Sequence, residues 1–202
     1  MKNYFWSLKN DSEDNEKSIS PKKTESNHIY FYSDIDHSSC LELNKMLEEK
    51  VDELLFISMR NDLRKDYGKP KLYLHINSFG GVIFSAISSM DTILRLRNKI
   101  DIITIVEGGV ASAGTLISIV GTHRWITSNS FMLIHQLSSG LWGKYKDLKD
   151  GVQNCDKFME MIKNIYAKYT SVPPEEIDQI LDHDLWWDAN KCLELKLVDK
   201  II

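Results

Sequence analysis

The sequence predicts an α/β fold in which helices pack on a parallel β-sheet. Three runs rich in β-branched and aromatic residues, 29–32, 71–76 and 102–106, indicate strands. Segments between and after these runs carry apolar residues at helical spacing, and glycine-rich turns follow the second and third runs. Strands that alternate with helices are typical of a parallel sheet with right-handed crossovers. We therefore expect one α/β domain.

The overall composition is that of a soluble globular protein. With 202 residues the chain is long enough for one well-buried core and short for two. It is 43% hydrophobic and 27% charged, and its net charge of −4 gives no reason to expect a nucleic-acid partner. No apolar run approaches the ~20 residues of a membrane span, and the N-terminus leads into charge instead of a signal-peptide core. We expect a cytoplasmic protein without membrane association.

The cysteines argue against both a disulfide framework and a zinc site. Their number is odd, they are widely separated, and no C-x-x-C pair occurs; they are Cys40, Cys155 and Cys192. This usage is typical of a reducing compartment. We expect neither a metal nor another cofactor.

The first part of the chain divides into a polar arm and the start of the domain. Residues 1–27 are expected to be a flexible arm, because charged and small polar residues dominate and little can be buried. The domain is expected over 28–202, beginning with the strand at 29–32. A helix from about Ser38 to Arg60 follows, with a broad apolar stripe made of Leu41, Leu43, Met46, Leu47, Val51, Leu54 and Leu55.

The second expected strand leads into a glycine-rich turn. A charged loop at 61–70 precedes this strand, 71–76, which runs directly into Asn77–Gly81. Paired glycines between a strand and a helix offer free backbone N–H groups and positive φ where it is required. The helix after them has apolar residues at 3.6-residue spacing: Val82, Ile83, Ala86, Ile87, Met90, Ile93 and Leu94.

The third expected strand ends at a turn that contains Ser112. The small residues of Gly108–Thr115 separate the strand from an apolar helical run at 116–120. A serine at such a junction can expose its hydroxyl, and the N–H groups of the first helical turn then face whatever the hydroxyl attacks. The G-x-S-x-G pattern is not met, because Val110 occupies the position of its first glycine. On this stretch alone, tight packing of a helix on a sheet is the better explanation of the small residues.

The next part of the chain is expected to contain two short strands and one long helix. The strands lie at 124–127 and 131–134, and the second leads directly to His135. The helix, from about Lys146 to Thr170, has apolar residues on more than one narrow face. A helix of this kind often packs against another subunit as well as its own body.

The C-terminal part is expected to hold two shorter helices. Pro173–Glu176 places proline and acids where a helix N-terminus prefers them. The chain leaves this helix near Asp184, beside two tryptophans, and Asp188 is a suitable N-cap for a closing helix that ends before Leu197.

Three side chains and one turn form a candidate catalytic group. Taken singly, each has an ordinary structural explanation: His135 as a core histidine, Asp184 as a cap or turn acid, and Asn77–Gly81 as a simple turn. Together with Ser112 they supply a nucleophile, a base, an orienting carboxylate and backbone N–H donors, all at strand ends or loops.

At these positions the chain resembles the ClpP family, the proteolytic subunits of the Clp protease within the ClpP/crotonase-like superfamily. The family's N-S-P-G-G appears as Asn77–Gly81, its G-x-A-A-S-M-G as Gly108–Gly114 and its M-I-H-Q-P as Leu133–Leu137. Its R-D-R-F-x-S-A corresponds to His183–Ala189 and its G-L-V-D to Lys196–Asp199. The chain is similar to divergent or phage-type members.

The resemblance implies a role for each site residue. Ser112 would be the nucleophile, His135 the general base and Asp184 the carboxylate that orients the histidine. Gly81 and Ala113 would supply the N–H groups of the oxyanion hole. Among the nearby acids, Asp184 alone matches the family's motif. The implied fold is a ClpP/crotonase-like arrangement of repeated β-β-α units with a protruding handle helix.

Four of the departures from the family's motifs bear on the turns of the site or on a helix end. Phe79 replaces a proline in the turn before the oxyanion glycines, so a fixed φ is lost. Ala113 replaces a methionine, and Leu137 replaces the proline after the His-Gln pair. Lys196 stands where a glycine usually ends a helix, at a cost of ~1 kcal/mol if left-handed geometry is kept. The charged N-terminal arm does not resemble the family's axial-loop segment.

The implied activity is that of a serine-type endopeptidase that cleaves peptides and unfolded proteins through an acyl-enzyme. The implied assembly is a chamber of two stacked heptameric rings joined by the handle helix, with an AAA+ unfoldase of the ClpX or ClpA type as partner. No G-x-x-x-x-G-K-[ST] phosphate-binding loop occurs in the chain, so ATP-driven unfolding would need that partner. The alternatives are a crotonase-type acyl-CoA enzyme, which would use no such triad, and a non-catalytic ring subunit.

Overall fold

The computed structural model describes residues 27–61 and 68–202. Most of the expected N-terminal arm, and most of the charged loop before the second strand, therefore lie outside the described residues. Asn27 is described, and its carbonyl accepts a hydrogen bond from the Tyr73 N–H at 2.9 Å. This hydrogen bond joins the first described residue to β2.

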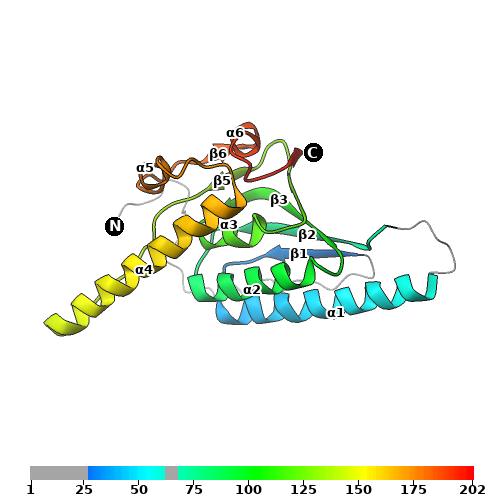
Figure 1. Cartoon of the computed structure of the whole chain (residues 1–202), viewed down its shortest axis with the longest axis horizontal. Helices are drawn as coiled ribbons and strands as arrows, with labels where there is room; N and C mark the ends of the chain where they lie inside the picture. The colour runs from blue at the N-terminus through cyan, green and yellow to red at the C-terminus, as the bar shows by residue number, and fades with distance from the viewer. Residues whose placement is uncertain (1–26, 62–67) are drawn as a thin grey trace, which may run out of the picture.

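A parallel sheet forms the centre of the molecule, as predicted (Figure 1). Its order is β1-β2-β3-β4-β7, and every neighbouring pair along this path is parallel. The strands span His28–Tyr32 (β1), Lys71–Ser78 (β2), Asp101–Ala111 (β3), His123–Ile126 (β4) and Lys200–Ile201 (β7).

Two further strands extend the sheet at the carboxyl end of β3. Strand β5 (Phe131–Leu133) runs parallel to β3 and pairs with its residues Gly109, Val110 and Ala111. Strand β6 (Trp187–Asp188) pairs antiparallel with β5. The pairing with β5 explains why β3 continues through Gly108 and Gly109, beyond the expected end of the strand at residue 106.

Two long helices cover one side of the sheet. Helices α1 (His37–Asn61) and α2 (Ile83–Leu96) lie side by side beneath strands β1 to β3 in the view of Figure 1. The Asp36 carboxylate accepts the Ser39 N–H at 2.7 Å and so caps the start of α1. Hydrogen bonds to this carboxylate hold the pKa of Asp36 below its usual value.

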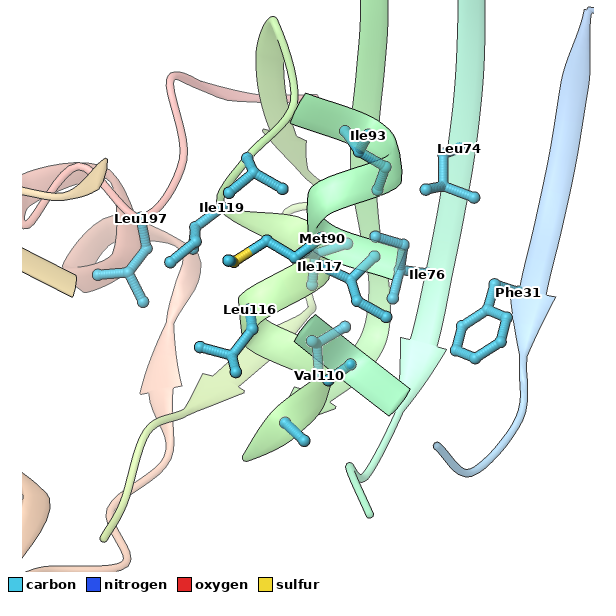
Figure 2. Close-up of a cluster of buried hydrophobic side chains, with 14 of the residues drawn as sticks. Phe31, Leu74, Ile76, Met90, Ile93, Val110, Leu116, Ile117, Ile119 and Leu197 are labelled. Carbon is cyan, nitrogen blue, oxygen red and sulfur yellow. The ribbon is translucent and has the colours of Figure 1, made fainter. Parts of the chain in front are cut away.

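The short helix α3 (Ala113–Ser118) follows β3 and packs against α2. Figure 2 shows how apolar side chains from the sheet, α2 and α3 meet in one core. All of the labelled side chains are buried: Phe31, Leu74, Ile76, Met90, Ile93, Val110, Leu116, Ile117, Ile119 and Leu197. This core fixes the position of the β3–α3 junction.

Helix α4 (Tyr145–Tyr169) projects away from the body of the domain (Figure 1). Its N-terminal half is exposed and includes the apolar side chains of Leu148 and Val152, and Trp142 just before it is 100% exposed. The buried residues of α4 are Ile162, Ile165 and Tyr166, near its C-terminal end. The geometry matches the expected handle, while its packing on a second copy stays a prediction.

Two short helices complete the domain: α5 (Ile177–Leu181) and α6 (Ala189–Glu194). The Asp188 carboxylate accepts the Lys191 N–H at 2.8 Å, which confirms the expected N-cap of the closing helix. Lys196 has φ = 56°, so the left-handed helix end is kept without a glycine.

Candidate active site

Ser112 lies at the junction between β3 and α3 in a sparsely populated backbone conformation. Its φ is 54° and its ψ is −130°, a combination that costs about 1–3 kcal/mol for a residue with a side chain. The Ser112 N–H donates to the carbonyl of Leu133 in β5 at 2.9 Å. The last strand pairing therefore holds the serine at the point where the chain turns into the helix.

A buried hydrogen-bond chain fixes the carbonyl side of the same residue. The Thr115 N–H and the Thr115 hydroxyl both donate to the Ser112 carbonyl, at 3.0 Å and 2.6 Å. The Tyr166 hydroxyl lies 2.6 Å from Thr115 Oγ1 and is the donor in that contact, because the Thr115 proton is already used. Burial raises the pKa of Tyr166 far above its ordinary value, so the phenol keeps its proton. Helix α4 is thus tied to the backbone of Ser112.

The glycine turn after β2 packs directly against Ser112. Gly80 and Gly81 have φ values of 97° and 143°, which L side chains rarely adopt. A Cβ atom on Gly80 would lie 2.7 Å from Ser112 Cβ and 3.1 Å from the Ala113 nitrogen. A Cβ atom on Gly81 would lie 2.1 Å from the Ile35 carbonyl oxygen. Gly80 is therefore required for the two turns to meet, and Gly81 is required for the turn to pair with Ile35.

His135 and Asp184 meet at the end of the antiparallel β5–β6 pair where β5 ends and β6 begins. His135 follows β5 and Asp184 lies between α5 and β6, with Nδ1 and Oδ1 separated by 3.3 Å. The His135 side chain is 19% exposed and the Asp184 side chain 33%. Asp188 is engaged as the cap of α6, and Asp182 ends α5 as an exposed residue. Of these three acids, Asp184 lies against the imidazole.

Ser112, Ala113, Gly81 and His135 line one pocket of about 90 Å³. Its apolar wall consists of Ile83, Leu116, Leu137, Ile162 and Tyr166, and Gln136 and Ser138 also line it. Within the described part of the chain, no hydrogen bond joins the Ser112 hydroxyl to the His135 imidazole. Such bonds are often long in unliganded sites and tighten when substrate binds.

The arrangement has the components of acyl transfer: a serine hydroxyl, an imidazole, a carboxylate at Nδ1 and two turns with backbone N–H groups. All five predicted site residues lie at this locality; the Asp184 carboxylate lies beside the imidazole and outside the set of residues that line the pocket. Among the described residues, no group of three or more His, Cys, Asp or Glu side chains is placed to hold a metal ion. No described helix is both long and apolar enough to cross a membrane.

Two supporting residues were not predicted from the sequence. The sequence indicated Thr115 only as one of the small residues after Ser112, and Tyr166 only as part of the expected long helix. The 51-residue separation of the two hydroxyls hides their contact in the sequence. A hydroxyl three residues after the proposed nucleophile is the signal that could have indicated Thr115.

The comparisons with known proteins identify the family and the fold of the chain. The family model described as "Clp protease" matches residues 22–202. A solved structure of a mutant ClpP1 from Listeria monocytogenes is similar in fold, with a TM-score of 0.70 and 21% sequence identity over 87% of this chain and 91% of that chain. The family match covers the strands, the helices and every candidate site residue. The chain belongs to the Clp protease family.

Proposed function

We propose that this chain is a serine-type endopeptidase of the Clp type, which cleaves peptides and unfolded proteins through an acyl-enzyme. The observation that carries the proposal is the meeting of strained Ser112 with the Gly80–Gly81 turn in the pocket that His135 lines. Strain at a nucleophilic serine between a strand and a helix is a recurring device for exposing its hydroxyl.

In the proposed mechanism His135 acts first as base and then as acid. Its Nε2 takes the proton of the Ser112 hydroxyl while Oγ attacks the scissile carbonyl carbon. The N–H groups of Gly81 and Ala113 donate to the oxygen that becomes negative in the tetrahedral intermediate. The imidazolium then gives its proton to the leaving amine, and water hydrolyses the ester by the same steps. Asp184 holds the Nδ1–H tautomer throughout, across the 3.3 Å contact.

The apolar side of the pocket supports the binding of an apolar substrate side chain. Leu116 comes from α3, and Ile162 and Tyr166 come from the buried end of α4. Burying an apolar group of the substrate there contributes roughly 25 cal/mol per Å² of area removed from water. The same contact places the adjoining carbonyl beside Ser112.

We propose further that copies of this chain assemble into two stacked heptameric rings through α4. The exposed apolar side chains of its N-terminal half, with the fully exposed Trp142, support this assembly. In such a chamber Ser112 faces an enclosed space, so folded proteins are excluded and an AAA+ unfoldase supplies unfolded chains. The localisation that fits this system is cytoplasmic.

Labelling with a fluorophosphonate probe tests the activity. The wild-type chain should be labelled at Ser112 and should cleave short fluorogenic peptides. Ser112→Ala should abolish labelling and lower peptide turnover by about 10⁴-fold or more, with an unchanged mass by light scattering. An assembled wild-type chain that neither labels nor cleaves would instead be a non-catalytic ring subunit.

A parallel assay tests the chamber. The assembled protein alone should cleave small peptides and leave a folded protein intact over the same period. A monomer by light scattering, or digestion of the folded protein without a partner, contradicts the proposed assembly while leaving the serine chemistry in place.

A further inference from the structure

Two aromatic side chains connect the loops that carry the two halves of the site. Phe79 directly precedes the Gly80–Gly81 turn, and Trp186 lies two residues after Asp184. Their rings meet edge to face, with centroids 6.0 Å apart and an interplanar angle of 79°. This is a favoured geometry for an aromatic pair.

Both rings also rest on the same point of β3. A Cβ atom on Gly109 would lie 3.5 Å from Phe79 Cε1 and 3.5 Å from Trp186 Cζ3, which is ordinary contact distance. Gly109 is three residues before Ser112 and pairs with Phe131 of β5. The aromatic pair therefore connects the Gly80–Gly81 turn to the loop that carries Asp184, and it crosses β3 at Gly109.

The contact between Phe79 and Trp186 is one of those that hold the segment between α5 and β6. Residues 182–185 are all exposed, and Trp186 is the half-buried side chain of the segment. The ends of the segment are fixed by the hydrogen bond from the Gln136 N–H to the Leu181 carbonyl at 2.8 Å and by the β5–β6 pairing. Between these anchors, Trp186 supplies the packing next to Asp184.

The sequence points to the same pair. Phe79 departs from the proline of the family's turn motif, and Trp186 stands at the position of a phenylalanine in the family's acid motif. The chain therefore has a larger aromatic ring at position 186 and an additional aromatic ring at position 79, and the two rings are in contact.

We infer that Phe79 and Trp186 are positioning residues: their contact sets the Asp184 loop, and through it His135, relative to the oxyanion turn. This inference rests on the proposed peptidase function. The pair does not touch the reacting atoms; it acts through the Asp184–His135 contact.

Peptide kinetics on variants of both residues test the inference. Trp186→Ala and Phe79→Ala should each lower kcat by about tenfold with little change in KM, and the double variant should be no slower than the worse single variant. Trp186→Phe should retain most of the turnover, because a ring edge still reaches Phe79. Leu185→Ala, in the same exposed segment, is the matched control and should turn over like the wild type.

A second arm separates positioning from general damage to the fold. In an Asp184→Asn background, Trp186→Ala should cost less than about twofold, because the carboxylate that it positions is already absent. A full tenfold cost in that background overturns the inference. If Trp186→Ala fails to assemble, Phe79→Ala tests the same contact from its exposed partner.

The outcomes distinguish this inference from the proposed function. A wild-type chain that turns over peptide, with Phe79→Ala and Trp186→Ala variants equally fast, overturns the positioning role alone. A wild-type chain that neither labels at Ser112 nor cleaves peptide overturns the proposed function and the positioning role with it.

Discussion

The two sides of the candidate site, which we call the nucleophile side and the acid side after the proposed roles of Ser112 and Asp184, are built in different ways. Ser112 sits on a buried junction, with its N–H bonded to β5 and its carbonyl held by Thr115, which is in turn bonded to Tyr166. Asp184 lies in an exposed segment, and its carboxylate approaches His135 at 3.3 Å.

The two sides have different tasks: the nucleophile side holds a strained backbone, and the acid side orients a carboxylate. The nucleophile side maintains an unfavourable backbone conformation, which persists only when surrounding contacts over-determine it. The acid side has to orient a carboxylate, a task that a partly exposed side chain can perform with modest packing. Changes on the nucleophile side should therefore cost more than equivalent changes on the acid side.

After the loss of the Ser112 hydroxyl itself, the largest effect is expected from Gly80→Ala, which disrupts the packing of the nucleophile side. The added methyl group would lie 2.7 Å from Ser112 Cβ, and the position has φ = 97°. We expect a loss of kcat/KM of about 10³-fold, since the oxyanion turn and Ser112 are forced apart. Peptide kinetics on the assembled variant measure this loss.

Gly140→Ala is the matched control for that change. A Cβ atom at Gly140 has no heavy atom within 4 Å, apart from its chain neighbours, so the variant should behave like the wild type. Normal turnover in Gly80→Ala would show that the two turns do not cooperate.

A smaller effect is expected from Asp184→Asn on the acid side. The amide can present a donor to Nδ1 and so favour the tautomer that cannot accept the Ser112 proton. Because the native contact is long and partly exposed, we expect a loss of kcat of about 10²-fold, less than a fully buried acid would give. Asp182→Asn should leave kcat unchanged, and the reverse order would identify Asp182 as the orienting acid.

The next effect, from Tyr166→Phe, tests whether the hydrogen bond between Tyr166 and Thr115 helps to hold the strained backbone of Ser112. The ring stays in the pocket wall while the hydroxyl that donates to Thr115 is lost. We expect the free energy of unfolding to fall by about 1 kcal/mol, with turnover within about threefold of the wild type. Thr115→Val removes both hydrogen bonds and should cost more; equal costs in chemical denaturation would contradict the chain of bonds.

The smallest effect concerns a left-handed residue away from the site. Lys196 ends α6 with φ = 56°, and the N–H groups of Lys196 and Leu197 donate to the carbonyls of Leu193 and Cys192. Lys196→Gly should raise the free energy of unfolding by about 0.5–1 kcal/mol without changing turnover. Lys196→Ala, which keeps a Cβ atom, should give no gain; an equal gain would exclude relief of backbone strain as the cause.

The long elements of the fold could be predicted because they carry strong periodic patterns. The expected helix from Lys146 to Thr170 matches α4 to within one residue at each end, and the strand at 71–76 matches the start of β2. Strand β6 could not be predicted, since two residues carry no period and their pairing with β5 depends on the tertiary structure.

The sequence predicts which residues belong to the candidate site, but it predicts little of what supports them. Ser112 and His135 follow apolar runs that mark strand ends, whereas the choice of Asp184 over its neighbours depended on the family motif. The contacts that hold these residues, such as Thr115 with Tyr166, join positions far apart in the chain. Sequence periodicity contains no information about such pairs.

The graded burial of α4 means that this helix is not a single cooperative unit. Its first turns lie in solvent and Gly151 lowers the helix propensity of the exposed half, whereas Ile162, Ile165 and Tyr166 are held in the domain. In an unassembled copy of the chain, local opening should therefore start at the N-terminal end, and backbone amides there should exchange with solvent long before those around Tyr166. The exposed half can open and close while the residue that ties α4 to Thr115 stays in place.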